Sequence, residues 1–125
     1  EEMRMMKLEE ARGALGSESV YFDYDKAALS DDAREILAEK AAYMINNPDI
    51  QVTIEGHCDE RGSNEYNLAL GERRAAAARK YLVNFGVNEA SIETVTYGEE
   101  RPVCRESRES CWKLNRRAAF VVDEY

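Results

Sequence analysis

The chain has 125 residues, of which 44% are hydrophobic and 34% are charged, and its formal net charge is -8. This length fits one folded domain, and the acidic balance disfavours non-specific binding to nucleic acid. The sequence has no apolar run long enough to cross a bilayer and no apolar core of a signal peptide. The chain is therefore expected to be either cytosolic or the trimmed, mature part of a longer protein.

The elements are expected in the order β-α-β-α-β-β. Residues 1–18 are charged and rich in Met, which predicts a linker or a frayed helix ahead of a domain at 19–125. Alternating apolar residues predict strands at 19–25, 50–56, 91–98 and 116–122. Ser30 can cap a first helix that ends at Asn46-Asn47-Pro48, and Gly86 can end a second helix from about Asn64 to Phe85.

The strands have one apolar side each, so both helices are expected on one face of a four-stranded mixed sheet, an α/β two-layer sandwich. Residues 101–115 are expected to form a long loop with one helical turn. Cys104 and Cys111 bracket the polar part of this loop. A disulfide there would imply an oxidising compartment, and two reduced thiols are the alternative. A zinc site is disfavoured, because no CxxC motif or second histidine accompanies them.

The strongest signal for a site lies in the second helix. Arg74 falls on the apolar stripe between Leu70 and Ala78, whereas Arg73 points away toward water. A buried guanidinium needs an anion, and the nearest candidate is Asp59 in the preceding loop. One alternative is a structural ion pair between the two side chains. The other is an open cleft in which Asp59 holds the ammonium, and Arg74 the carboxylate, of an amino-acid head group.

Other features of this region favour binding over catalysis. Gly71 is unfavourable in mid-helix, which suggests a close approach by a ligand or a neighbouring chain, with chance variation in the sequence as the alternative. His57, Cys58 and Asp59 are consecutive, so their side chains diverge and cannot easily share a metal ion. No second histidine is present to serve as a base or ligand. We therefore expect a binding module without a metal or cofactor, not an enzyme, with Cys58 as a small, half-buried residue.

Three segments, in this order and spacing, resemble the peptidoglycan-associated lipoprotein branch of the OmpA-like domains. They are VYFDYDKAALSDDAREIL, VTIEGHCDERGSNEYNLALGERRAAAARKYL and NRRAAFVV, and the resemblance spans about Ser19 to Val122. It implies the same β-α-β-α-β-β fold and non-covalent binding of peptidoglycan stem peptides through diaminopimelate. In this family the free amino-acid end of that residue is held at the positions of Asp59 and Arg74. The resemblance places the rest of the pocket at Tyr24, Asp25, Asn67 and Leu70, with Arg61 as a further candidate.

The resemblance also implies a location and partners. The domain would lie in the periplasm of a Gram-negative bacterium, tethered to the outer membrane by a lipidated cysteine upstream of this chain. It would bind TolB and other Tol or outer-membrane proteins. A disulfide in the corresponding loop of other OmpA-like domains supports the pairing of Cys104 with Cys111. The alternatives are the wall anchor of a porin-like or flagellar-stator protein with the same fold and, in another class, a peptidoglycan-processing enzyme.

Overall fold

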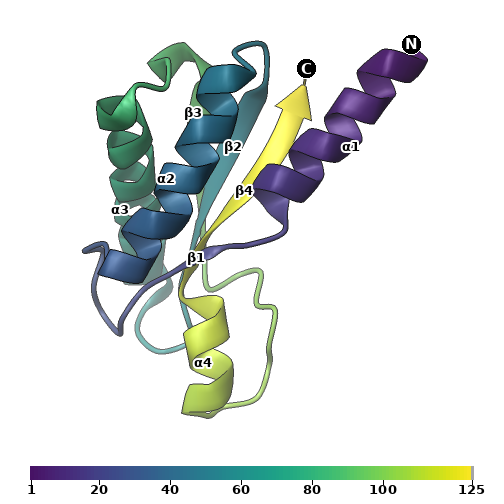
Figure 1. The fold of residues 1–125 in the computed structure, drawn as a ribbon. Coiled ribbons are helices and arrows are strands. Elements are labelled where there is room, and N and C mark those ends of the chain that lie inside the picture. The colour runs from purple at the N-terminus through teal and green to yellow at the C-terminus, as the bar shows by residue number, and fades with distance from the viewer. Residues whose placement is uncertain (125) are drawn as a thin grey trace.

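The computed structural model describes residues 1–124, which form a four-stranded sheet with the three longest helices packed on one face (Figure 1). In chain order the elements are α1 (Glu2–Gly16), β1 (Val20–Tyr21), α2 (Asp31–Asn46), β2 (Gln51–His57), α3 (Asn64–Phe85), the 3-10 helix η1 (Glu89–Ser91), β3 (Ile92–Gly98), α4 (Glu109–Asn115) and β4 (Arg117–Glu124). No helix among these residues is long and apolar enough to span a membrane.

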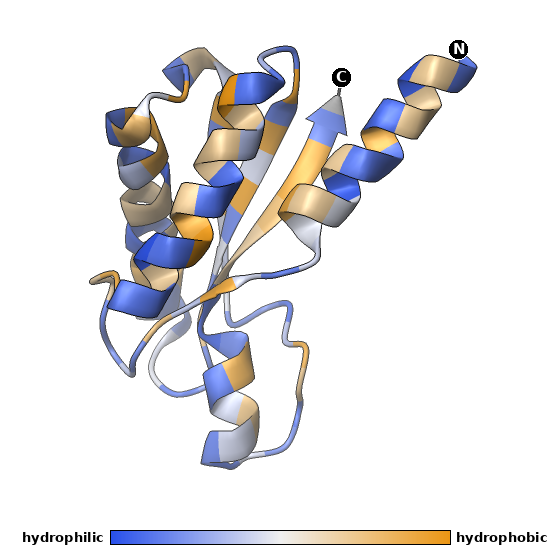
Figure 2. Ribbon diagram, viewed as in Figure 1, coloured by the Kyte–Doolittle hydropathy of each residue, from blue (hydrophilic) through white to orange (hydrophobic). Residues whose placement is uncertain are grey.

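The sheet has the strand order β1-β4-β2-β3 and is mixed, as expected from the sequence. Strands β2 and β3 are parallel, and β4 runs antiparallel to β1 and to β2. Val52 and Ile54 of β2 and Phe120 of β4 are buried in the core under the helices. Polar and apolar residues alternate along β2, which Figure 2 shows as alternating blue and orange bands. This one-sided pattern confirms the predicted two-layer α/β fold.

The two long helices begin and end at the expected residues. The Ser30 hydroxyl accepts a hydrogen bond from the Ala33 amide at 3.1 Å, and α2 ends at Asn46. The Ser63 hydroxyl likewise accepts from the Tyr66 amide at the start of α3. Gly86 follows α3 with a φ of 128°, a conformation that favours glycine.

Three segments differ from the expectation. Strand β1 covers only Val20–Tyr21, because the chain turns away from the sheet before residue 25. Helix α4 makes two turns, not one. Residues 2–16 form an ordered helix whose Ala11 and Leu15 are fully buried, and the Lys40 ammonium of α2 donates to the Leu15 carbonyl at 2.6 Å.

Helix α3 crosses the sheet at a contact between two glycines. A Cβ on Gly56 of β2 would lie 1.7 Å from the Gly71 carbonyl oxygen, and a Cβ on Gly71 would lie 2.4 Å from the Thr96 hydroxyl. The segment that approaches Gly71 is therefore the sheet itself. This contact places Arg74, one turn further along α3, directly over the end of β2, where it donates to the His57 carbonyl at 2.9 Å.

We expect Gly56→Ala to destabilise the domain by roughly 2 kcal/mol or more, because the backbones of β2 and α3 must separate to admit the methyl group. Urea unfolding followed by circular dichroism measures this change. Gly13→Ala is the matched control, since nothing lies within 4 Å of its added Cβ. Gly13 lies in the last turn of α1, where that change should stabilise by less than about 1 kcal/mol. Equal effects at the two positions would contradict the close packing at Gly56.

Candidate binding site

A pocket of about 310 Å³ is lined by residues of the loop that joins β2 to α3 and of neighbouring segments. This loop lies at the end of the sheet opposite the N terminus of α1 (Figure 1). The seven site residues expected from the sequence all lie on the wall of the pocket, together with Cys58, Gly62 and Tyr66. The seven are Tyr24, Asp25, Asp59, Arg61, Asn67, Leu70 and Arg74. They come from the segment after β1, the loop after β2 and the first half of α3, so the fold brings three separate parts of the chain together.

Arg74 is fully buried on this wall, as its position on the apolar stripe predicts, whereas Arg73 is exposed. The Arg74 guanidinium donates to three backbone carbonyls, those of Asp23 at 3.0 Å, Lys26 at 2.9 Å and His57 at 2.9 Å. Burial lowers the pKa of the Arg74 guanidinium. Among residues 1–123 no side-chain carboxylate lies within ion-pair distance of the Arg74 guanidinium. Carbonyl dipoles hold this cation in place without neutralising its charge.

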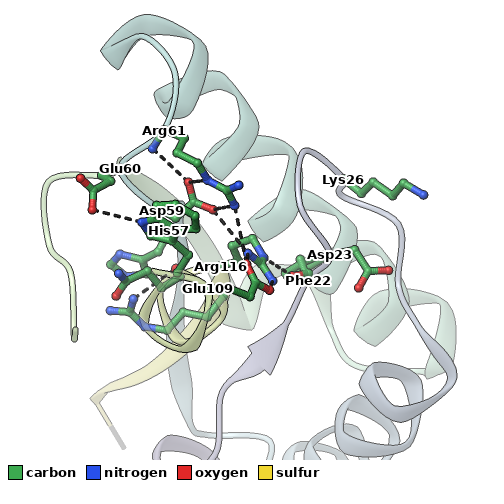
Figure 3. Close-up of polar contacts among 12 residues, drawn as sticks. Phe22, Asp23, Lys26, His57, Asp59, Glu60, Arg61, Glu109 and Arg116 are labelled. Atoms are coloured by element: carbon green, nitrogen blue, oxygen red, sulfur yellow. Dashed lines mark hydrogen bonds and ion pairs between the residues drawn. The ribbon is translucent and has the colours of Figure 1, made fainter. Parts of the chain in front are cut away.

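Asp59 is also buried, with 4% of its surface exposed, and it pairs with two other arginines (Figure 3). Arg61 donates to both of its carboxylate oxygens, at 3.2 Å and 2.8 Å, and Arg116 lies 3.5 Å from the second. Burial alone would raise the pKa of the Asp59 carboxyl, but the hydrogen bonds from Arg61 outweigh burial, and the pKa lies below its ordinary value. The closed Asp59–Arg74 ion pair considered above is therefore not observed.

The two arginines that hold Asp59 are themselves held by other elements. The Arg61 guanidinium lies 3.9 Å from the Tyr24 ring centre and 4.0 Å from that of Trp112 in α4. Arg116 forms a bidentate pair with Glu109 of α4, at 3.1 Å and 2.9 Å, and donates to the Phe22 carbonyl. Helix α4 is joined to the preceding loop by the disulfide between Cys104 and Cys111, which confirms the expected pairing.

Two further wall residues hold the loop after β2 in place. The Asn67 amide donates to the carbonyls of Asp59 and Arg61 and to the Glu99 carboxylate, at 3.4, 3.0 and 2.8 Å. The Cys58 thiol donates to the Asn67 carbonyl at 3.2 Å. Cys58 is fully buried, not half-buried as expected, and burial raises the pKa of its thiol to about 11. This thiol is therefore protonated and weakly reactive at neutral pH.

The turn at Tyr24 and Asp25 forms the outer wall of the pocket. Asp25 has a φ of 57°, in the left-handed region, and its carboxylate accepts a hydrogen bond from the Tyr66 hydroxyl of α3. The carbonyls that flank this turn, of Asp23 and Lys26, are the two that Arg74 holds. The turn therefore packs against one side of the guanidinium. Because Arg74 is fully buried, a ligand contacts it only if its surroundings shift.

Three residues that support the site were not expected from the sequence: Arg116, Glu109 and Trp112. A double arginine directly before the alternating residues of β4 was the available signal for Arg116. Glu109 and Trp112 stand in a segment expected to be mostly loop, and their contacts with Arg116 and Arg61 depend on how α4 folds back under the pocket.

The chain resembles known proteins in sequence. A family model described as the OmpA family matches residues 21–116. The peptidoglycan-associated lipoprotein of Rhizobium meliloti is 48% identical over 103 residues, which are 82% of this chain and 58% of that protein. The Brucella melitensis protein is 45% identical over 83% of this chain and 62% of its own length. The Haemophilus influenzae protein is 44% identical over 82% of this chain and 67% of its own length. The chain thus spans about three fifths to two thirds of the length of these curated relatives.

The chain also resembles solved structures in its fold. The crystal structure of the peptidoglycan-associated lipoprotein from Burkholderia pseudomallei superposes with a TM-score of 0.82 at 43% identity, covering 84% of this chain and 89% of that one. The C-terminal domain of Helicobacter pylori MotB superposes with a TM-score of 0.81 at 18% identity, covering 88% and 87%, which shows a shared fold alone. The chain belongs to the OmpA family and, within it, to the branch of the peptidoglycan-associated lipoproteins.

Proposed function

We propose that this domain is a binding module, not an enzyme, and that its pocket holds the free amino-acid end of diaminopimelate in peptidoglycan stem peptides. The observation that carries the proposal is the buried charge of Arg74, which lies on the pocket wall with no carboxylate of the described residues beside it. A buried cation without an anion is costly, and a ligand carboxylate would remove that cost. The pocket volume of about 310 Å³ suits one amino-acid head group.

In this proposal each end of the zwitterion has its own partner. A guanidinium carries five N–H groups, and Arg74 gives one from each of its three nitrogens to the carbonyls of Asp23, Lys26 and His57. Two N–H groups therefore remain for a ligand carboxylate. The ammonium group approaches Asp59, where it shares the carboxylate oxygens with Arg61. The Asp25 and Tyr66 side chains separate to admit the ligand, while the carbonyls of Asp23 and Lys26 stay on Arg74.

We further propose that the domain anchors the outer membrane to the cell wall within a Tol-Pal type system, with TolB as a partner. It would work in the periplasm, tethered by a lipid anchor upstream of this chain. Support comes from relatives called peptidoglycan-associated lipoproteins at 44–48% identity. The disulfide between Cys104 and Cys111 fits an oxidising compartment.

Calorimetric titration with two synthetic stem peptides tests the ligand. The first carries diaminopimelate with its free carboxylate, and the second carries the same residue amidated at that carboxylate. We expect the amidated peptide to bind roughly 30-fold more weakly or worse, because it leaves the Arg74 charge unpaired. Equal affinity for the two peptides would contradict the assignment of Arg74. Release of muropeptides from sacculi by the protein would instead indicate an enzyme.

A further inference from the structure

Helix α4 lies outside the pocket, yet it supports the carboxylate that the pocket presents. None of the described residues on the pocket wall belongs to α4. Two side chains of this helix, Glu109 and Trp112, contact the two arginines that pair with Asp59. Both arginines pair with the Asp59 carboxylate, so α4 supports this carboxylate indirectly, through Arg61 and Arg116.

The contact of Trp112 with Arg61 has the geometry of a clamp. The guanidinium lies within 4.0 Å of the centres of both the Tyr24 and the Trp112 rings, well inside the distance of about 6 Å at which a cation and a ring attract. Held in this way, Arg61 directs its Nε and one terminal nitrogen to the two oxygens of Asp59, at 3.2 and 2.8 Å. An arginine side chain has many rotamers. Because the two rings restrict these rotamers before the ligand binds, Arg61 loses less conformational entropy when it holds this geometry.

Trp112 itself is fixed by its own surroundings. Its indole N–H donates to the Glu60 carboxylate at 3.1 Å, and the neighbouring Cys111 is bonded to Cys104. Asn115, at the end of α4, accepts from the Val103 and Cys104 amides at 2.8 and 3.2 Å. A helix of seven residues is not stable alone, so these links to the loop keep the indole in place.

We propose that Trp112 is a positioning residue of the binding site: it presses Arg61 against Asp59 and thereby sets the affinity for the ammonium end of the ligand. This proposal rests on the proposed function and deepens it. The clamp orients the Asp59 oxygens before the ligand arrives, so less ordering remains to be done on binding. Trp112 needs no contact with the ligand for this role.

Trp112→Ala and Trp112→Phe separate this role from a general loss of structure. We expect Trp112→Ala to weaken binding of the diaminopimelate peptide about fivefold or more, and Trp112→Phe, which keeps a ring over Arg61, to stay within about twofold of the wild type. Lys113→Ala, an exposed neighbour on α4, is the control and should bind normally. Urea unfolding of each variant shows whether the domain stays folded.

A carboxyl NMR titration of Asp59 in the ligand-free protein gives a second, independent readout. The measured pKa should rise toward the ordinary value in Trp112→Ala and stay low in Trp112→Phe, because only the alanine variant releases Arg61. The proposal is overturned if the titration of Asp59 is the same in all three proteins, if alanine and phenylalanine weaken binding equally, or if neither does. If the wild-type protein fails to bind the peptide, the proposed function fails, while the titration still decides whether Trp112 positions Asp59.

Discussion

Replacing Arg74 with alanine is expected to abolish measurable binding of the domain to purified sacculi. Removing one partner of a desolvated charge pair costs about 2 to 5 kcal/mol, which corresponds to a loss of roughly 30-fold or more in affinity. The same change should also destabilise the fold. The carbonyls of Asp23, Lys26 and His57 each lose a donor, and we expect a loss of about 3 kcal/mol or more in the free energy of unfolding.

Because of this instability, binding should be measured at a temperature where circular dichroism shows that Arg74→Ala is folded. Arg73→Ala is the matched control, since Arg73 precedes Arg74 on the same helix but is exposed and does not line the pocket. It should bind sacculi like the wild type and unfold within about 0.5 kcal/mol of it. A folded Arg74→Ala protein that still binds sacculi would show that this arginine serves the fold alone.

The second large effect is expected at Asp59. Asp59→Asn keeps the shape of the side chain but removes its charge, so the ligand ammonium loses its partner, and Arg61 and Arg116 keep only Glu109 as an anionic partner. We expect affinity for the diaminopimelate peptide to fall by about 2 kcal/mol or more, measured by calorimetry at pH 7. Asp49→Asn, at an exposed carboxylate just before the opposite end of β2, removes the same net charge and should leave binding unchanged.

The stability difference between the wild type and Asp59→Asn should depend on pH in a defined direction. The folded-state pKa of Asp59 lies below its ordinary value, so the unfolded chain takes up a proton first as the pH falls. The stabilisation by the charged carboxylate is therefore fully present above about pH 5 and declines as the pH falls below about 4. A difference that instead grew as the pH fell would contradict the ion pairs described for Asp59.

Much of the architecture could be predicted from the sequence, because helix caps and alternating apolar residues are local signals. The Ser30 hydroxyl caps α2, α3 begins at Asn64, and Gly86 ends α3, all as expected. The length of β1 could not be predicted in this way. The alternation of Val20, Phe22 and Tyr24 continues past the strand, but Arg74 binds the carbonyls beyond it and holds them in a turn.

The position of Arg74 could be predicted from helical phase, but its partners could not. Backbone carbonyls are present at every residue, so the three that surround this guanidinium leave no mark in the sequence. Asp59 was expected to face Arg74 across the cleft, and its ion pairs are instead with Arg61, two residues away, and Arg116, at the start of β4. The contact with Arg116 depends on the fold of the whole sheet, which no spacing in the sequence encodes.

The most direct test of the account is a crystal structure of the domain soaked with a diaminopimelate-containing stem peptide. We expect a ligand carboxylate within about 3 Å of the Arg74 guanidinium, the ligand ammonium beside Asp59, and the Asp25 side chain displaced from Tyr66. A peptide bound elsewhere on the domain, with Arg74 still buried, would contradict the proposed binding of the ligand carboxylate by Arg74.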